Sequence, residues 1–529
     1  MFYHANKQSA ADHAGETTKN APNKGQEAFF MLALIAVGLS VLFAGTSLAE
    51  TRPNFLFFVA EDMGAQIGVM RTPEVKTPTL DSLAKNGVLF ERAYTTCPTC
   101  SPSKASIMTG HYPHTHNLRI NVNETFGPFP PELTDQQKTH NEKLAIPDSM
   151  PTLIEKLREG GYRTGVMKKF HLSPHDKFPY DAWFPSHNPL KIIDFIKDSG
   201  ETPWFLMVGY DATHRKFRYD DEAVEPDSDG MELPAHLPPT DSVKTDWAEY
   251  LKAVQNIDSQ VYDALSAIEA SGQKEDTIVL FLGDHGPAYH RAKFSPYALG
   301  LHVPIIFSGP EALIHPREEA VSELVSFVDL MPTILDYAGI EIPMGLQGKS
   351  LRDLLIGSPD GKGHDYVFGE IHHGTSDTAV DLQERCIFDG RYRLLFRNHL
   401  EKTYKVPADV KNLSVWNNPV YEETILRRAE YPLEYGFLAQ RDSSQPGTAP
   451  PFELYDTALD PWEINNVYGD PEYKTVSVQL IQELLNWVLE TNDRYVEAAV
   501  LETELNRIEN GSDRTGGSGS TCFVGTTKR

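Results

Sequence analysis

The sequence predicts an α/β protein with a large, parallel β-sheet, followed by a smaller α+β domain with an antiparallel sheet. Two patterns lead to this prediction. Short apolar runs bounded by turn residues are typical of strands buried on both faces of a sheet, and segments with helical periodicity alternate with them. The 529 residues are 40% hydrophobic and 23% charged, which is the composition of a globular protein long enough for more than one domain.

The strands and helices of the large sheet are expected in the first 360 residues. The apolar runs predicted to be strands are Asn54–Ala60, Tyr162–Met167, Trp204–Tyr210 and Thr277–Leu282. The helices expected between them are Thr77–Asn86, Met150–Glu159 and Trp247–Ser271. Because strands and helices alternate, the strands should run parallel, and their carboxyl ends should meet at one edge of the sheet.

A change of composition near residue 360 predicts a boundary between two domains. The segment Gly357–Gly363 contains three glycines and a proline and is typical of a linker. The elements expected beyond it are strands at Asp365–Glu370, Glu384–Asp389 and Tyr392–Arg397, a turn at Asp389-Gly390, and a helix near Ser477–Arg494. We therefore predict a large domain over 50–360, a smaller α+β domain over 361–510, and a disordered tail over 511–529 that is rich in Gly, Ser and Thr.

The amino-terminal region predicts export. The apolar stretch Phe29–Ala49 ends in Ser47-Leu48-Ala49, whose small residues are typical of a signal-peptide cleavage site, so residues 1–49 are interpreted as a signal peptide with a polar extension. The alternative is a retained membrane anchor, because the stretch is close to the length of a membrane span. We expect a periplasmic or secreted protein, lysosomal in a eukaryotic host, with no stable membrane partner.

The net charge of −26 argues against nucleic acid as a partner. An anionic ligand would have to bind in a local positive pocket, because the field of the whole protein repels it.

The residues around Cys100 predict the start of a short helix. Ser101 is a suitable N-cap, Pro102 suits the first turn, and Gly110 is placed to end the helix. Cys100 then lies just before a helix N-terminus, whose free N–H groups favour an anion. The alternative is that Cys97 and Cys100 form a disulfide loop or half of a zinc site, although no second paired-cysteine motif exists.

Charged side chains follow two of the predicted strands at the point where each strand ends. Glu61 and Asp62 follow the first strand, and Asp284 and His285 follow the strand that ends near Leu282. Ligands of open α/β sheets bind beyond the carboxyl ends of the strands. Three carboxylates and an imidazole there suggest a hard divalent cation, whereas a pair of acidic residues at one strand end, taken alone, is more often a solvated helix cap than a ligand.

The run from Cys100 to Gly110 resembles the active-site motif of the sulfatase family, C-x-P-S-R followed by T-G, with Lys104 at the position of the arginine. Three further segments resemble family motifs in the family's order. They are 162–171, against T-G-x-x-G-K-W-H; 204–214, against a strand followed by a histidine; and 293–304, against K-x-x-x-Y-x-x-G-x-x-x-P. The resemblance spans residues 52 to 470.

This resemblance implies an alkaline phosphatase-like large domain with a mixed, mostly parallel central sheet flanked by helices. It implies that a maturation enzyme oxidises Cys100 to formylglycine, whose hydrate attacks the sulfur of a sulfate group. It also implies one divalent cation, with calcium preferred and magnesium as the alternative. The ligands implied for this cation are Glu61, Asp62, Cys100, Asp284 and His285, with Glu61 at a position where the family usually has aspartate.

The resemblance also gives roles to basic side chains. Lys104, Lys169 and Lys293 would contact the sulfate oxygens, His214 or Lys293 would protonate the leaving group, and His171 would act as a base in sulfate release. The implied catalytic set is Cys100, Lys104, Lys169, His171, His214 and Lys293. Without the family, 168–171 is equally typical of a basic surface turn, and a lone histidine at 214 would be structural.

Within the family, the short loops at 168–171, 211–215 and 371–373 resemble those of heparan N-sulfatase (sulfamidase). This implies an N-sulfoglucosamine or related sulfated glycan end as substrate, with His372 and His373 as candidate specificity contacts or as plain exposed surface. One alternative is an O-sulfatase on another polysaccharide or an aryl sulfate. A second is a phosphatase or phosphodiesterase of the alkaline phosphatase superfamily, against which Cys100 argues. The third is a non-catalytic sulfatase-like binding protein, if Cys100 is not matured.

Overall fold

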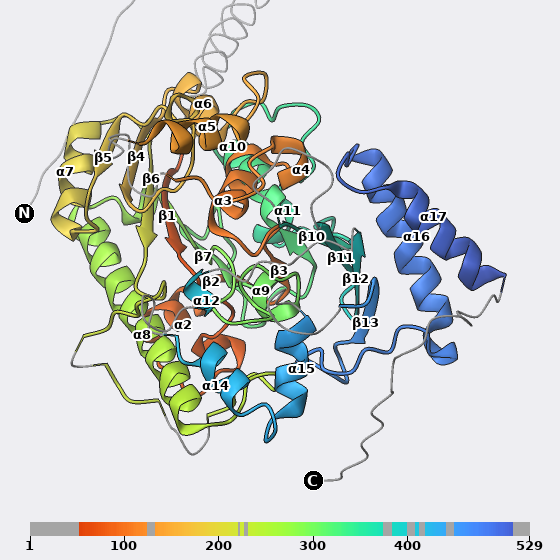
Figure 1. The fold of residues 1–529 in the computed structure, drawn as a ribbon. Helices are drawn as coiled ribbons and strands as arrows, with labels where there is room; N and C mark the ends of the chain where they lie inside the picture. Colours follow the sequence, from red (N-terminus) through yellow and green to blue (C-terminus); the bar gives the residue numbers. More distant parts are fainter. Residues whose placement is uncertain are drawn as a thin grey trace, which may run out of the picture. The chain divides into compact units, whose positions relative to one another are not determined.

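The computed structural model describes residues 52–123, 133–220, 223–226, 231–373, 383–398, 408–411, 418–440 and 449–510. From Arg52 onward they belong to one compact unit that contains a seven-stranded and a four-stranded sheet (Figure 1). The signal peptide predicted over 1–49 and the tail predicted over 511–529 lie outside the described residues. None of the described helices is both long enough and apolar enough to cross a membrane.

The large sheet has the strand order β2-β8-β7-β1-β6-β4-β5. Its strands are β1 (Asn54–Ala60), β2 (Gly87–Phe90), β4 (Arg163–Lys168), β5 (Ala182–Phe184), β6 (Trp204–Tyr210), β7 (Thr277–Gly283) and β8 (Ile305–Ser308). The strands from β7 to β5 in this order are parallel, whereas β8 is antiparallel to both β7 and β2. This confirms the predicted mixed, mostly parallel sheet, and the four apolar runs are its central strands.

The register of the central strands brings their carboxyl ends to one edge. Ala60 at the end of β1 lies opposite Tyr210 of β6 and Gly283 of β7. Beyond this point the Glu61 N–H donates to the Tyr210 carbonyl at 2.8 Å, and the Asp284 N–H donates to the Ala60 carbonyl at 2.8 Å. The charged residues that follow β1 and β7 therefore begin side by side.

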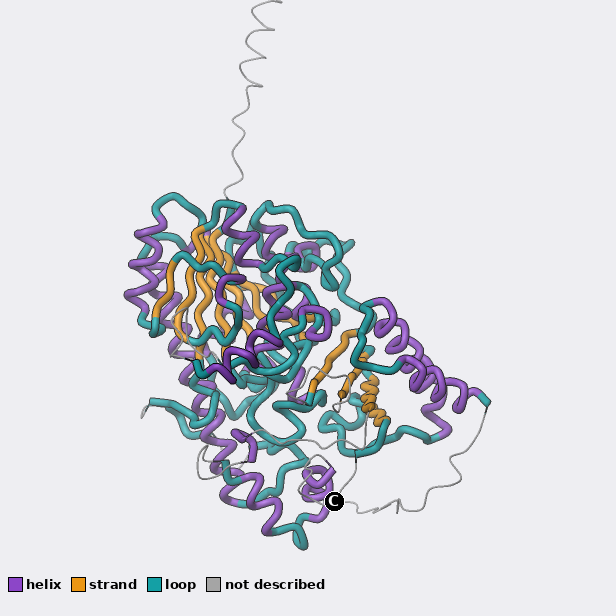
Figure 2. Tube along the Cα trace, turned by 45° about the horizontal axis from the view of Figure 1, so that its top comes forward, coloured by secondary structure: helices purple, strands orange, loops and turns teal. Residues whose placement is uncertain are grey.

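Helices cover both faces of this sheet, and Figure 2 shows its strands between two groups of helices. On one face, α3 (Cys100–Thr109), α6 (Leu153–Glu159) and α10 (Leu330–Tyr337) pack against Phe57 and Phe205. On the other face, α2 (Pro78–Lys85), α7 (Pro189–Ser199) and α8 (Asp241–Ala270) pack against Leu56 and Leu206. Burial of each such leucine or phenylalanine contributes about 1.5–3 kcal/mol to folding, so the apolar strands fix the positions of both helix layers.

The smaller sheet is antiparallel, with the order β10-β11-β12-β13. Its strands are β10 (Val367–His372), β11 (Gln383–Phe388), β12 (Tyr392–Asn398) and β13 (Phe452–Asp456). The helices α16 (Lys474–Glu490) and α17 (Ala498–Glu509) lie beside this sheet (Figure 1) and share its apolar core. The predicted antiparallel sheet and closing helix are confirmed, and the domain boundary at residue 360 stays a prediction.

The remaining described strands and α-helices are mostly short. They are β3 (Ala93–Tyr94), β9 (Val325–Ser326), α4 (Pro113–His116), α5 (Asp135–Lys143), α9 (Ala298–Leu301), α11 (Arg352–Leu355), α12 (Ala408–Lys411), α14 (Val420–Leu426) and α15 (Pro432–Gln440).

Candidate active site

Helix α3 delivers Cys100 to the carboxyl edge of the large sheet. Cys100 is the first residue of α3, and Thr99 occupies the N-cap position that we expected for Ser101. Ser101 lies inside the helix, where its N–H donates to Asn121 Oδ1 at 3.0 Å. Gly110 ends the helix in the left-handed region at φ 68°, as predicted. The Cys100 Sγ atom lies 3.3 Å from His285 Nε2 and 3.9 Å from Asp62 Oδ1.

Three carboxylates converge beside Cys100. Glu61, Asp62 and Asp284 each offer an oxygen atom, and these three atoms lie within 4.8 Å of one another. The Asp62 N–H donates to Asp284 Oδ1 at 2.8 Å, which joins the ends of β1 and β7. All three side chains are completely buried. Such a cluster of anions is stable only when cations compensate it.

Three buried lysines supply that compensation. Lys104, from α3, contacts Glu61 and lies 3.1 Å from Asp284 Oδ2. Lys169, after β4, lies 2.6 Å from Glu61 Oε2. Lys293 lies 2.9 and 3.0 Å from the two carboxylate oxygens of Asp62. The structure thus brings together all three lysines that the sequence predicts at this site.

The lysines keep two of the carboxylates ionised. Burial raises the pKa of Glu61, but Lys104 and Lys169 lower it further, so the net pKa lies well below its ordinary value. Burial likewise raises the pKa of Asp62, and Lys293 is the main cause of its net decrease.

The other two acids of the cluster shift the opposite way. Burial and the charge of Glu61 raise the pKa of Asp284. Burial also raises the pKa of the Cys100 thiol, and Lys293 and Lys169 offset this only in part. Unmodified Cys100 is therefore a neutral thiol at physiological pH and a poor nucleophile.

The three histidines predicted for the catalytic and metal sites each contact a backbone carbonyl. His171 Nε2 lies 3.0 Å from the Val122 carbonyl, and burial together with Lys169 lowers the pKa of its ring. His285 Nδ1 lies 2.8 Å from the Gly286 carbonyl, which leaves Nε2 toward Cys100. His214, half-buried, has Nδ1 2.7 Å from the Arg215 carbonyl, and its charge lowers the pKa of Asp62.

The donor set fits a hard divalent cation. Glu61 Oε2 and Asp284 Oδ2 are buried and accept no hydrogen bond, although Lys169 and Lys104 lie 2.6 and 3.1 Å from them as ion-pair partners. A second set of donor atoms, from Asp62, Cys100 and His285, also lies within 4.8 Å. Carboxylate oxygens with unused lone pairs are the ligands that calcium and magnesium prefer.

The cysteine alternatives are not supported. Cys97, Cys100 and Cys386 are free thiols, so the disulfide loop is excluded. Among the described residues, no group of potential metal ligands includes Cys97, which argues against half of a zinc site.

His372 and His373 lie in buried contacts with carboxylates rather than on an exposed surface. His372 Nε2 lies 3.0 Å from Glu370 Oε1, and His373 Nε2 lies 2.8 Å from Glu384 Oε2. Each side chain is only 1% exposed. The plain-surface interpretation is therefore wrong, and a role in substrate specificity stays a prediction.

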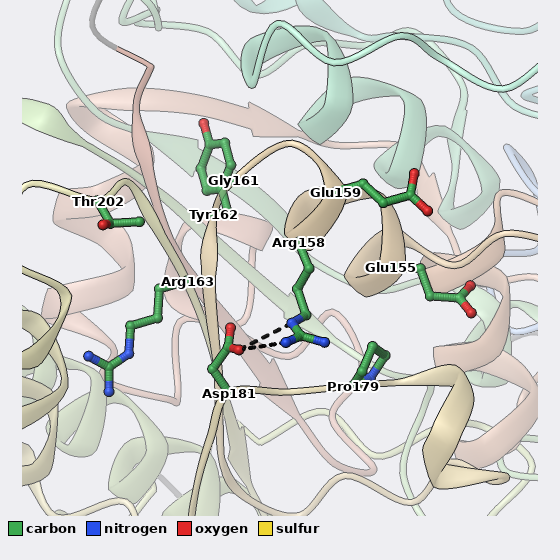
Figure 3. Close-up of a pocket in the computed structure, with 9 residues that line it drawn as sticks. All are labelled: Glu155, Arg158, Glu159, Gly161, Tyr162, Arg163, Pro179, Asp181 and Thr202. Atoms are coloured by element: carbon green, nitrogen blue, oxygen red, sulfur yellow. Dashed lines mark hydrogen bonds and ion pairs between the residues drawn. The ribbon is translucent and has the colours of Figure 1, made fainter.

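A separate pocket of about 730 Å³ lies at the opposite edge of the sheet, near the amino ends of β4 and β6 (Figure 3). Arg158 crosses it and contacts Asp181 at 3.0 Å. None of the predicted site residues lines this pocket, so its size does not make it the candidate active site.

Sequence reasoning missed several residues that support the site. The Thr213 hydroxyl donates to the Glu61 carbonyl, and Asn121 accepts from the first turn of α3. Arg215 makes a buried bidentate ion pair with Asp246. Thr213 and Arg215 lie beside His214 in the sulfamidase-like loop 211–215, which is the signal in the sequence that points to them.

Comparison with known proteins agrees with this geometry. The sulfatase family profile matches residues 53–190 and 188–340, and the profile of the N-sulphoglucosamine sulphohydrolase C-terminal region matches 283–429. An ulvan-active sulfatase of Formosa agariphila is 29% identical over 87% of this chain and 78% of its own length. Human N-sulphoglucosamine sulphohydrolase is 27% identical over 87% of this chain and 95% of its own length.

Solved structures show the same fold. A 2-O GAG sulfatase superposes with a TM-score of 0.59 at 20% identity, and the alignment covers 84% of this chain and 93% of that one. The family profile, the two sheets and the cluster around Cys100 lead to one conclusion: this chain is a hydrolase of the sulfatase family, with an alkaline phosphatase-like fold and a resemblance to sulfamidase.

Proposed function

We propose that this protein removes sulfate from a sulfated glycan, with an N-sulfoglucosamine end as the preferred substrate. The observation that carries the proposal is the position of Cys100 at the N-terminus of α3, in contact with Asp62 and His285 and close to the buried lysines. The alternative substrates are O-sulfated polysaccharides and aryl sulfates. Relatives that act on ulvan support that alternative, and the sulphohydrolase profile supports the preferred one.

Two groups complete the proposed site. A divalent cation, preferably calcium, held by Glu61, Asp62, Asp284 and His285, would supply charge stabilisation, and formylglycine made from Cys100 by a maturation enzyme would supply the nucleophile. The chain's own cations do the rest of the binding. Lys104, Lys169 and Lys293, with the free N–H groups of α3, surround the place where sulfate oxygens would carry charge.

His214 is the proposed general acid. Because Nδ1 contacts the Arg215 carbonyl, the proton exchanged with substrate is held at Nε2. This proton passes to the leaving oxygen or nitrogen as its bond to sulfur breaks. Lys293, the other proton donor considered, is held by both oxygens of Asp62 and is better suited to binding charge.

His171 is the proposed base for sulfate release. The lowered pKa of its ring keeps it neutral, so it is able to accept a proton at physiological pH.

The first experiment uses protein made in its native host. Mass spectrometry of the peptide that contains Cys100 should give the mass of the aldehyde or its hydrate, and the protein should release sulfate faster from N-sulfoglucosamine than from O-sulfated sugars. Faster release from O-sulfated sugars supports the alternative substrates. An unmodified thiol with no sulfate release supports a binding protein and contradicts the proposed function.

The same preparation tests localisation. We propose that the protein is exported, and the amino terminus of the mature chain should then begin at Glu50, as expected from the apolar stretch before it. A chain that keeps this stretch contradicts cleavage and supports the membrane anchor.

A further inference from the structure

A buried ion pair lies directly behind His214. Arg215 Nη1 donates to Asp246 Oδ1 at 2.7 Å, and Arg215 Nη2 donates to Asp246 Oδ2 at 2.6 Å. The two side chains are only 1% and 3% exposed. Asp246 belongs to the long helix α8, which is anchored along the sheet by apolar side chains. A bidentate pair of this kind fixes both the position and the orientation of the guanidinium.

The same carboxylate also holds a second segment of the site. The Tyr289 hydroxyl donates to Asp246 Oδ2 at 2.7 Å, and Arg215 Nε donates to the Ala288 carbonyl at 3.4 Å. The Arg215 guanidinium lies 5.0 Å from the centre of the Tyr289 ring. Residues 288 and 289 belong to the segment that joins His285 to Lys293. Asp246 therefore connects α8 to both segments that carry proposed catalytic groups.

The contact between His214 and Arg215 links the ion pair to the proposed general acid. His214 Nδ1 lies 2.7 Å from the carbonyl oxygen of Arg215, so the position of that peptide sets the direction of the imidazole. We propose that Asp246 is a positioning residue, which holds His214 in place for proton transfer by fixing Arg215. The inference rests on the proposed function.

Stability alone does not account for this pair. A buried ion pair gains little over apolar side chains of the same volume, because both charges lose their hydration. The ion pair does fix the position of the Arg215 backbone, and proton transfer depends strongly on geometry.

The test compares Asp246→Asn with wild type on two substrates with different leaving groups. A sulfated sugar needs a proton on its leaving oxygen or nitrogen, whereas an aryl sulfate with an acidic phenol does not. We expect Asp246→Asn to lower kcat on the sugar about tenfold or more, within the range of general acid catalysis, with KM nearly unchanged. On the aryl sulfate the loss should be below about threefold.

A second readout tests whether Asp246 acts through His214. In a His214→Ala background, Asp246→Asn should cause no further loss on the sugar, because residues that act as a unit are not additive. In wild type, kcat on the sugar should fall at high pH as His214 loses its proton, and this limb should move or flatten in Asp246→Asn.

Asp456→Asn is the matched control for loss of a buried carboxylate. Asp456 forms a bidentate pair with Arg391, at 3.0 and 2.7 Å, at the edge of the smaller sheet. This variant should lower the unfolding temperature and leave the ratio of the two substrates and the pH profile unchanged. Tyr289→Phe removes one hydrogen bond to Asp246 and replaces Asp246→Asn as the test if that variant does not fold. We expect Tyr289→Phe to cause a smaller loss of kcat, on the sugar only.

The outcomes separate this inference from the proposed function. Equal losses on both substrates, or additive losses in the His214→Ala background, would show that Asp246 is structural only and would overturn the inference. Wild type that releases no sulfate from either substrate would contradict the proposed function itself.

Discussion

Glu61 and Lys104 are the two site residues at which the sequence departs from the usual sulfatase pattern, and the structure places them in contact. The carboxylate is one methylene longer than the expected aspartate, and the cation lacks the planar guanidinium of arginine. The longer carboxylate at position 61 and the smaller cation at position 104 therefore fit each other, which neither position shows by itself.

This contact predicts that the two positions are energetically coupled. Lys104→Arg should lower the free energy of unfolding by about 1–3 kcal/mol, because a larger cation must fit in a completely buried space between Glu61 and Asp284. Adding Glu61→Asp should restore part of the loss. Denaturation in urea measures the free energy of unfolding of Lys104→Arg, of Glu61→Asp and of the double variant. Strictly additive effects would contradict the coupling.

The pKa of Cys100 leads to a prediction about any chain that escapes maturation. Burial raises the pKa of this thiol, so the thiolate should be scarce even near pH 8.5, where about half of an exposed cysteine is ionised. Iodoacetamide should alkylate Cys100 much more slowly in the folded protein than in the same protein denatured in guanidinium chloride. Mass spectrometry measures both rates, and equal rates would mean that the thiol is accessible and ionised.

The histidines show where prediction from sequence ends at this scale. The residues after β1 and β7 were predictable, because a parallel sheet brings the ends of its strands together. The burial of His372 and His373 was not, since it depends on Glu370 and Glu384, which pair with them only after β10 and β11 have formed. The ion pair of Arg215 and Asp246 was hidden for the same reason.

At the scale of elements, the long apolar strands were predictable and the short strands at or next to the edges of the sheet were not. β2, β5 and β8 have three or four residues, too few for a pattern to stand out from the turns around them. Helix α8 begins at Asp241, six residues before the predicted Trp247, because its polar first turn carries no apolar periodicity and only the Thr240 cap marks it.

The junction of β1 and β7 predicts a site that tolerates no added side chain. A Cβ atom on Gly283 would lie 1.8 Å from the Met63 carbonyl oxygen, so Gly283→Ala must separate Asp62 from Asp284. We expect calcium affinity to fall about 10- to 100-fold, as for changes that displace metal ligands indirectly. Calorimetry on metal-free protein measures this effect.

Gly436→Ala in α15 is the control for this change. A Cβ atom there meets nothing within 4 Å, and alanine favours a helix by about 0.5–1 kcal/mol over glycine. Its calcium affinity should be that of wild type. If both variants bind calcium normally, the strand junction does not set the metal site.

Glu370 connects β10 to other elements, and its contacts predict that the fold becomes less stable in acid. His114 lies 2.6 Å from its Oε2 atom, and Arg385 lies 3.7 Å from the same atom. Burial raises the pKa of Glu370, but His114 and Arg385 produce a net decrease. Its ionised form therefore stabilises the fold above the unfolded pKa, about 4.3, and this stability is lost as the pH falls toward the folded pKa.

Glu370→Gln tests this contribution. At neutral pH it should cost about 3–5 kcal/mol, because it leaves Arg385 partly uncompensated. The difference from wild type should shrink below about pH 4, where the unfolded wild-type chain takes up a proton that folded Glu370 does not. Urea denaturation at the two pH values measures it, and a difference independent of pH would contradict the assignment.

The whole molecule carries a net charge of −26, yet its candidate site is lined with lysines. The overall field should slow the approach of a polyanionic glycan, and added salt screens that field over about 8 Å at physiological ionic strength. Within the buried site the lysine contacts are screened much less.

We therefore expect kcat/KM on a polysulfated glycan to rise when sodium chloride is added from low ionic strength. A small substrate with a single sulfate should show a weaker dependence. Steady-state rates over a salt series measure both, and a steady fall of kcat/KM for the glycan would show that binding depends on exposed cations.

Three carboxylates and three lysines meet in the core beside Cys100, and their formal charges sum to zero when all six are ionised. A newly made chain is therefore able to finish folding in surroundings poor in divalent ions and to take up the proposed cation later. Chelation should then switch the enzyme off without unfolding it.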